Sequence, residues 1–304
     1  MTLRPNYLVH APSWNPDQGG SIFMHLLVHH LTLQGEDAAI WPWYRDPRPG
    51  LLTTARGILR KPSLLLGSGR RFLNPELHTR LARFGDLRPE TIVVYPEIRL
   101  GNPLEATNVV RWLLYKPGLQ HRYRFTDDEM FFRVGEICDM PDITGGAQDL
   151  VMWQRNRVYR NEERPDRHGA CYLVRKGQDK PRIAETQGAI CIDGKSHEEV
   201  ADIFNRCTTF YSYDEASFYS QYAAICGCDS VVIPGLYASR EEWTQAHHVA
   251  RYGVAYGLKD IDHARATRHL VEGLLAEKEE EGRRSVSAFI DATQERFGSK
   301  SATA

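Results

Sequence analysis

Short apolar runs that alternate with helical segments restrict the fold of this chain more than any other feature. The run "NYLVHA" (residues 6–11) suits a buried strand, "SIFMHLLVHHLTLQG" (21–35) has helical spacing and ends at a glycine, and "AAIWPW" (38–43) supplies the next strand. Strands and helices that alternate in this way build a parallel sheet covered by helices. The first part of the chain is therefore predicted to be α/β, continuing through a helix near 76–84 and a buried strand at 91–97.

The second half repeats the alternation more clearly. Its helices are predicted from a capping box at Ser196 and Glu199, from the segment 217–227, from a second capping box at Ser239 and Glu242, and from a long polar segment at 262–281. The apolar runs between them predict strands at 170–174, 188–194, 208–212, 230–235 and 252–257. This order is typical of a doubly wound sheet.

Length and composition fit two such domains in one chain. The 304 residues are 42% hydrophobic and 25% charged, which suits a globular protein of about two domains. We expect two Rossmann-like lobes with a cleft between them: an acceptor-side domain at 1–155, a nucleotide-sugar domain at 156–282, and a C-terminal helix or tail at 283–304. A net charge of −1 gives no field that would recruit nucleic acid, so no nucleic-acid partner is predicted.

The cysteines and the apolar runs indicate the compartment. Six scattered cysteines, an N-terminus without a basic and apolar leader, and no apolar run of ~18 residues predict a reduced, cytoplasmic protein. Cys226 and Cys228 flank one glycine and read as buried small side chains rather than as a metal or redox pair.

A basic stretch follows the first predicted strands. From Arg56 to Arg88 there are eight Arg or Lys residues against Glu76 and Asp86, a net of about +6. Such a stretch forms either a solvated face or a peripheral contact with anionic headgroups at the inner membrane face, or with a polyanionic acceptor.

Two longer segments resemble a known family. The stretch "CIDGKSHEEVADIFNRCTTFYSYDEASFYSQYAAICGCDSVVIP" (191–234) resembles the nucleotide-binding half of the two-domain glycosyltransferases called GT-B, and "GGSIFMHLLVHHLTLQGEDAAIWP" (19–42) resembles the first loop and helix of that family. Together with their order and spacing, they cover about half of the chain. In the family's paired-glutamate motif, Asp214 takes the first position and Tyr222 the second, so the chain keeps one carboxylate and departs from the pattern at the other.

The resemblance implies a sugar-nucleotide donor site in the second half. Asp214 can accept hydrogen bonds from a ribose diol, and the amides that follow it are expected to open a helix whose N-terminus favours diphosphate. The alternative is an ordinary capped helix with a satisfied aspartate. Arg175 and Lys176 would face the same phosphates from the neighbouring strand. The predicted donor-binding set is Gly19, Gly20, Arg175, Lys176, Asp193, Tyr213, Asp214, Ala216, Ser217 and Phe218.

The acceptor side needs a general base. Glu97, Asp17 and His10 stand at strand ends of the first lobe, and Glu97 follows its buried strand directly. Trp14, Trp41, Trp43 and Trp112 either stack on sugar rings or fill the core. No metal site is predicted, because Asp260 and Asp262 suit the start of a helix, His25 and His29 lack a third ligand, and Gly67–Gly69 has no preceding strand for a phosphate loop.

The sequence thus predicts a metal-independent glycosyltransferase of polysaccharide biosynthesis without a cofactor, using a nucleoside diphosphate sugar as co-substrate and a glycan or lipid-linked acceptor. One alternative is a sugar-nucleotide epimerase of the same fold. The other is a catalytically silent nucleotide-sugar-binding protein, which the tyrosine at position 222 favours.

Overall fold

The computed structural model describes residues 4–16, 18–45, 72–119 and 121–298, and it divides into two compact units. Unit 1 comprises Met1–Gln154 and Glu279–Ala304, and unit 2 comprises Arg155–Lys278. The predicted boundaries at residues 155 and 282, with a separate segment at 283–304, stay a prediction beside this division. The cleft expected between the lobes stays a prediction.

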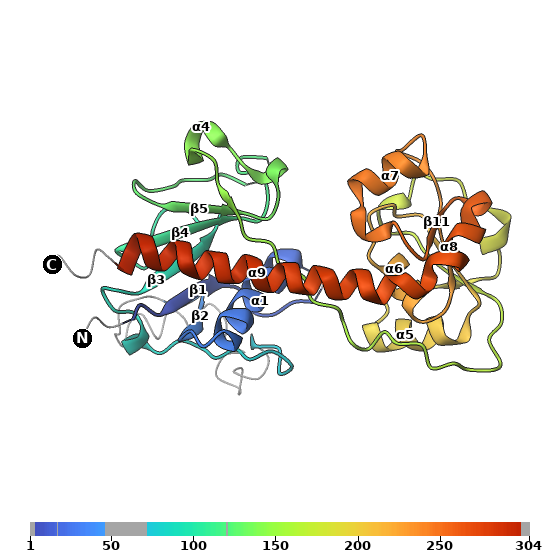
Figure 1. Cartoon of the computed structure of the whole chain (residues 1–304), viewed down its shortest axis with the longest axis horizontal. Coiled ribbons are helices and arrows are strands. Elements are labelled where there is room, and N and C mark those ends of the chain that lie inside the picture. The colour runs from blue at the N-terminus through green and yellow to red at the C-terminus, as the bar shows by residue number, and fades with distance from the viewer. Residues whose placement is uncertain (1–3, 17, 46–71, 120, 299–304) are drawn as a thin grey trace. The chain divides into compact units, whose positions relative to one another are not determined.

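The described part of unit 1 contains a sheet of six parallel strands in the order β2-β1-β3-β4-β5-β6 (Figure 1). The strands are β1 (Tyr7–Ala11), β2 (Ala38–Pro42), β3 (Ile92–Pro96), β4 (Asn108–Leu113), β5 (Met130–Arg133) and β6 (Gln148–Asp149). The chain therefore reverses its direction of travel across the sheet between β1 and β3. Loops that follow these two strands diverge at this point, which is where open α/β sheets bind ligands.

Side-chain alternation along the strands separates two cores in unit 1. Tyr7 and Val9 lie in the core formed with helix α1 (Gly19–Leu33) and helix α9 (Val271–Gly298). Helix α9 contributes Val286 and Phe289 to this core. Leu8 and its neighbours face the other side of the sheet, which is covered by the segments around Ala82 and Leu104. Both faces of the sheet are therefore covered by other segments, which is usual for a parallel sheet.

Unit 2 holds a second parallel sheet, with the order β11-β10-β9-β7-β8. Its strands are β7 (Ala170–Leu173), β8 (Ile190–Cys191), β9 (Thr209–Ser212), β10 (Asp229–Val232) and β11 (Val254–Tyr256). Its helices are α5 (His197–Arg206), α6 (Tyr219–Ile225), α7 (Arg240–Ala246) and α8 (Ile261–Thr267). The chain passes from β7 to β8 on one side of β7 and then returns to β9 on the other side. The switch point of this sheet therefore lies between β7 and β9. The predicted α/β class with two Rossmann-like units is confirmed.

Two helix predictions were wrong. Residues 76–84 form no α-helix, and only a short 3-10 helix begins at Phe84. The amide of His78 donates to His29 Nδ1 at 2.9 Å, and the backbone from Arg80 to Ala82 pairs with Ile40. The segment beginning at residue 262 is not one helix: α8 ends at Thr267, and α9 then begins at Val271 and continues to Gly298. The capping box of Ser196 and Glu199 at the start of α5 is confirmed.

Candidate functional site

A cavity of about 580 Å³ lies within unit 1 at its switch point. Its wall is formed by residues that follow β1, β2, β3 and β4 together with the N-terminal part of α1. The polar and aromatic side chains in this wall are those of Gln18, Ser21, Phe23, Trp43, Glu97, Tyr115, Lys116, His121 and Tyr123. The cavity therefore joins a carboxylate, two basic groups and several rings in one space.

Glu97 is the acidic group of this cavity. Glu97 directly follows β3 and is 5% exposed. Its Oε2 accepts a hydrogen bond from the Leu114 amide at 2.9 Å. Burial raises the pKa of the Glu97 carboxyl above its ordinary value, although the backbone groups of Leu114 and Tyr115 and the charge of His121 oppose this shift. A carboxylate with a raised pKa beside a cavity is suited to accept a proton near neutral pH.

Gly19 and Gly20 lie with Glu97 in the cavity wall, at the start of α1. A side chain at Gly19 would meet open space, so the glycine keeps the backbone of the first turn accessible from the cavity. The first turn carries no acidic residue, and Gln18 provides no side-chain cap. The structure thus brings together three of the residues predicted from the sequence: Gly19, Gly20 and Glu97.

His10, another of the candidate bases, does not line this cavity. His10 is 1% exposed on the sheet face opposite α1, where its ring lies edge-on to Tyr95 at 5.3 Å. Burial, helped by Arg99 and Arg111, holds the pKa of His10 well below its ordinary value, so the ring is neutral. Asp17 lies outside the described residues.

The tryptophans divide between core and cavity. Trp41 and Trp112 are fully buried, and Trp14 packs against the core of unit 1. Trp43 lines the cavity and donates from Nε1 to the His10 carbonyl at 2.6 Å, while the Arg99 guanidinium lies 5.9 Å from the centre of its ring. Trp43 is therefore the tryptophan positioned to contact a ligand there.

In unit 2, the predicted basic pair follows β7 at the switch point. Arg175 and Lys176 are exposed, and Arg175 has a φ of 37°, a left-handed conformation that favours glycine. The Asp193 carboxylate, which follows β8, accepts hydrogen bonds from the amides of Val174 at 2.8 Å and Arg175 at 3.0 Å. These hydrogen bonds lower the pKa of Asp193 despite its partial burial and hold the strained turn in place.

The remaining predicted donor residues follow β9, next to the basic pair. Tyr213 is buried, and its hydroxyl bonds to the Ile183 amide at 3.0 Å and to Thr186 Oγ1 at 2.8 Å. Gly177 packs so closely on the Tyr213 backbone that a Cβ would collide with it. This contact joins the loops after β7 and β9.

The expected helix start at residues 216–218 was wrong. Asp214 is 5% exposed and its Oδ1 accepts the Ala216 amide at 3.1 Å, while the Ser217 amide donates to the Asp214 carbonyl at 3.4 Å. Helix α6 begins only at Tyr219. The segment before it is a turn, in which the side chain and the carbonyl of Asp214 accept the amides of Ala216 and Ser217. Two of the amides expected to meet a diphosphate thus already have acceptors in this structure.

Glu215, which no sequence pattern singled out, is buried and fully engaged. Its carboxylate pairs with Lys180 at 3.0 Å and accepts hydrogen bonds from Tyr256, at 2.7 Å, and from the amides of Gly235 and Leu236. Burial acts to raise the pKa of the Glu215 carboxyl, but these partners outweigh it and lower that pKa below its ordinary value. Glu215 is therefore a structural carboxylate that ties the loop after β9 to the loop after β10.

Tyr222, at the departure from the family pattern, is also structural. Its ring stacks on Tyr159 with 4.0 Å between centroids, and its hydroxyl accepts the Asn156 amide at 3.2 Å. An aromatic cluster thus occupies the place of the second glutamate.

The candidate metal ligands do not gather into a site. Among the described residues, no three His, Cys, Asp or Glu side chains are placed to hold an ion. Asp260 pairs with Arg240 at 2.9 Å, whereas the side chain of Asp262 is 95% exposed, and His29 accepts from the His78 amide. Residues 67–69 lie outside the described part of the chain.

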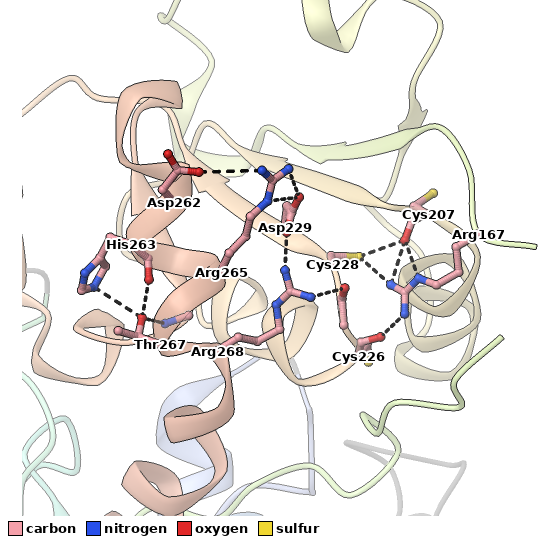
Figure 2. Close-up of polar contacts among 12 residues, drawn as sticks. Arg167, Cys207, Cys226, Cys228, Asp229, Asp262, His263, Arg265, Thr267 and Arg268 are labelled. Carbon is pink, nitrogen blue, oxygen red and sulfur yellow. Dashed lines mark hydrogen bonds and ion pairs between the residues drawn. The ribbon is translucent and has the colours of Figure 1, made fainter. Parts of the chain in front are cut away.

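The Cys226 and Cys228 pair belongs to a buried framework beneath the second sheet. Figure 2 shows the Arg167 guanidinium directed at the carbonyls of Cys226, at 2.6 Å, and Cys207, at 2.8 Å, and at the sulfur of Cys228. Nearby, Arg265 and Arg268 both pair with Asp229 at the start of β10. The cysteines are free thiols. Their contacts with Arg167 connect neighbouring segments of unit 2, so we interpret the pair as structural.

The basic stretch at 56–88 is described only from residue 72. In that part, Arg80 pairs with Asp37 at 2.6 Å and Asp86 at 2.5 Å, and Arg88 pairs with Glu90 at 3.2 Å. These cations are neutralised within the fold. None of the helices in the described ranges is long and apolar enough to cross a membrane.

Comparison with known proteins gives little more. No protein-family model matches the chain, and no curated protein matches it. A solved structure of sucrose-phosphate synthase from Thermosynechococcus elongatus is similar over 98% of both chains, with 10% sequence identity and a TM-score of 0.37. At this TM-score, the likeness carries no weight for the function of this chain.

Proposed function

We propose that this protein is a glycosyltransferase that moves a sugar from a nucleoside diphosphate donor to a hydroxyl of a glycan or lipid-linked acceptor. The observation that carries the proposal is Glu97, a buried carboxylate with a raised pKa in the wall of a cavity at the switch point of a parallel sheet.

In the proposed reaction, Glu97 acts as general base on the acceptor. The acceptor oxygen forms a bond to the anomeric carbon while the bond from that carbon to the diphosphate breaks, and the nucleoside diphosphate leaves with the electron pair. Glu97 takes the proton from the attacking hydroxyl. A single displacement of this kind inverts the configuration of the anomeric carbon. Trp43 and Tyr115 offer ring faces on which an acceptor sugar can pack in the cavity.

The donor is assigned to the switch point of unit 2. Arg175 and Lys176 are exposed beside the loop that carries Asp214, so positive charge is available there for a diphosphate. The Asp214 carboxylate is buried in that loop and would have to be reached by the ribose. The strained backbone at Arg175 supports a functional role, because a left-handed conformation at a residue other than glycine needs compensation from its surroundings. Since basic side chains would meet the phosphate charge, we expect transfer to survive EDTA.

A second candidate is a nucleotide-sugar-binding protein without turnover. Two observations favour it: the amides of Ala216 and Ser217 are already engaged, and Tyr222 is part of an aromatic cluster rather than a catalytic carboxylate. Such a protein would bind donor but transfer to no acceptor.

Thermal unfolding in the presence of UDP, GDP, dTDP and CMP sugars tests the donor assignment. A specific donor at 100 times its dissociation constant should stabilise the protein by about 2.7 kcal/mol. Asp214→Ala should weaken that binding by roughly 1.5 to 3 kcal/mol, whereas Asp262→Ala, at an exposed position, should not. Equal donor binding by the folded Asp214 variant and the control would remove the ribose assignment.

A further inference from the structure

Exposed apolar side chains lie on the two segments that border the cavity after β3 and β4. We define the cavity rim as residues 98–101, 115–119 and 121–124. The Gly101 amide joins the first and last of these segments by a hydrogen bond of 2.7 Å to the Arg124 carbonyl. Its exposed hydrophobic residues are Ile98 (37%), Leu100 (47%), Tyr115 (44%), Leu119 (64%) and Tyr123 (36%). Several of them also line the cavity, so the exposed apolar surface continues into it.

The same rim is basic. Lys116, Arg122 and Arg124 are exposed, and the sequence from 115 to 125 contains no acidic residue. None of these three cations forms an ion pair with a residue in the described ranges. They differ in this from Arg80 and Arg88, which are paired with acids of the fold. The rim therefore presents uncompensated positive charge among exposed apolar groups.

We propose that the cavity rim docks onto the surface of an anionic phospholipid bilayer. The five apolar side chains would enter the boundary between headgroups and acyl chains, and the cations would remain at the level of the lipid phosphates. Exposed leucine and tyrosine are costly in water and gain from this transfer, whereas a soluble polyanion would engage the cations and leave Leu119 and Leu100 in water. The combination of charge and apolar surface favours the bilayer.

This orientation gives the cavity a consequence for its substrate. A cavity that opens at a bilayer surface receives its acceptor from the lipid side, so the acceptor would be lipid-linked. That corollary rests on the proposed function, but the docking itself does not require any transfer activity.

Sedimentation with lipid vesicles tests the docking. We expect the full-length protein to bind vesicles that contain phosphatidylglycerol, to bind pure phosphatidylcholine vesicles far less, and to lose affinity as salt is raised. Arg122→Glu with Arg124→Glu should lower the partition coefficient by about 30-fold or more. Leu119→Ser should lower it by about tenfold.

Matched variants control for charge and for exposed apolar area. Lys259→Glu with Arg284→Glu makes the same charge change at exposed positions outside the rim, and Leu33→Ser removes a leucine that is 56% exposed at the other end of α1. Both controls should bind vesicles like the wild type. Thermal unfolding of each variant shows whether it is folded, and the salt and lipid dependence of the wild type tests the proposal without any variant.

Three outcomes would overturn the proposal: no preference of the wild type for anionic vesicles, equal losses in the rim and control variants, or binding that depends on Arg122 and Arg124 but not on Leu119. In the last case, tight binding of RNA or heparin would assign the rim to a soluble polyanion. Glu97→Gln should bind vesicles like the wild type, so a failure of docking and a failure of the transferase proposal are distinguishable.

Discussion

Arg111 and Glu129 form a fully buried ion pair, with 2.7 Å between Arg111 Nη2 and Glu129 Oε1 and 2.7 Å between Nε and Oε2. The remaining donors of Arg111 reach the carbonyls of Pro96, Arg99 and Gly101. The carbonyls of Pro96 and Arg99 lie on either side of Glu97, and those of Arg99 and Gly101 belong to the cavity rim. One guanidinium therefore fixes the loop that carries the proposed base.

The first prediction concerns the cost of breaking this pair. Arg111→Met leaves the Glu129 charge buried without its partner and should destabilise the protein by about 3 to 5 kcal/mol. Glu129→Leu should cost a similar amount, and the double variant should cost clearly less than the sum of the two. Urea unfolding of the three variants measures the coupling, and strictly additive losses would contradict it.

The second prediction concerns acid. His10, His25, His29 and His30 are buried in unit 1, and in each case burial lowers the pKa below its ordinary value of 6.5, to about 4 for His29. Below pH 6.5 the unfolded chain binds protons that the folded chain does not. Stability should therefore be fully present above that pH and fall as the pH is lowered, by up to ~1.4 kcal/mol per pH unit for each histidine.

Urea midpoints between pH 5 and pH 8 check this dependence. His29→Gln should flatten it, because the new side chain can still accept the His78 amide but cannot titrate. A midpoint that does not change between pH 5 and pH 7 would contradict the prediction.

Most strands and the position of Glu97 at a strand end could be predicted from the sequence, because both depend on local pattern. Glu97 directly follows an uninterrupted apolar run, and such a run must end at one edge of the sheet. The last strands of unit 1 were not predicted, since β6 has only two residues and β5 is only partly buried. Strands this short contain too few side chains to show the alternation of buried and exposed residues that identifies a strand in a sequence.

The errors arose where distant residues decide local structure. The segment 76–84 has an acceptable helical composition, but His29 and Ile40 take its backbone hydrogen bonds. Lys116 and His121 were missed as cavity residues because they lie on a long loop whose position depends on tertiary contacts, including the one between Gly101 and Arg124. The interleaved basic and aromatic residues of 115–125 were the available signal.

The third prediction separates strain from binding at Arg175. Arg175→Gly relieves the positive φ, whereas Arg175→Ala removes the same side chain and keeps the strain. The glycine variant should therefore be more stable than the alanine variant by about 1 kcal/mol. If the guanidinium meets the donor phosphates, both variants should lose donor affinity equally.

Thermal unfolding with and without the donor found by screening measures both quantities. Equal stability of the two variants would show that the turn is not strained. Donor affinity equal to that of the wild type would show that Arg175 does not contact the phosphates.

The fourth prediction is the pH dependence of transfer. Because burial raises the pKa of Glu97 above 4.5, the proposed base loses its function by protonation at a higher pH than an exposed glutamate would. The transfer rate should thus decline as the pH falls through that raised pKa. A wild-type rate that stays constant down to pH 4.5 would exclude Glu97 as the base.

The most direct measurement is the single-turnover transfer rate of Glu97→Gln, with donor affinity determined on the same protein. The substitution keeps the size of the side chain and removes the proton acceptor. We predict an unchanged dissociation constant for the donor and a transfer rate lower by ~10² to 10⁴-fold. A rate equal to that of the wild type, or a loss of donor binding together with the rate, would contradict the assignment of Glu97 as the general base on the acceptor.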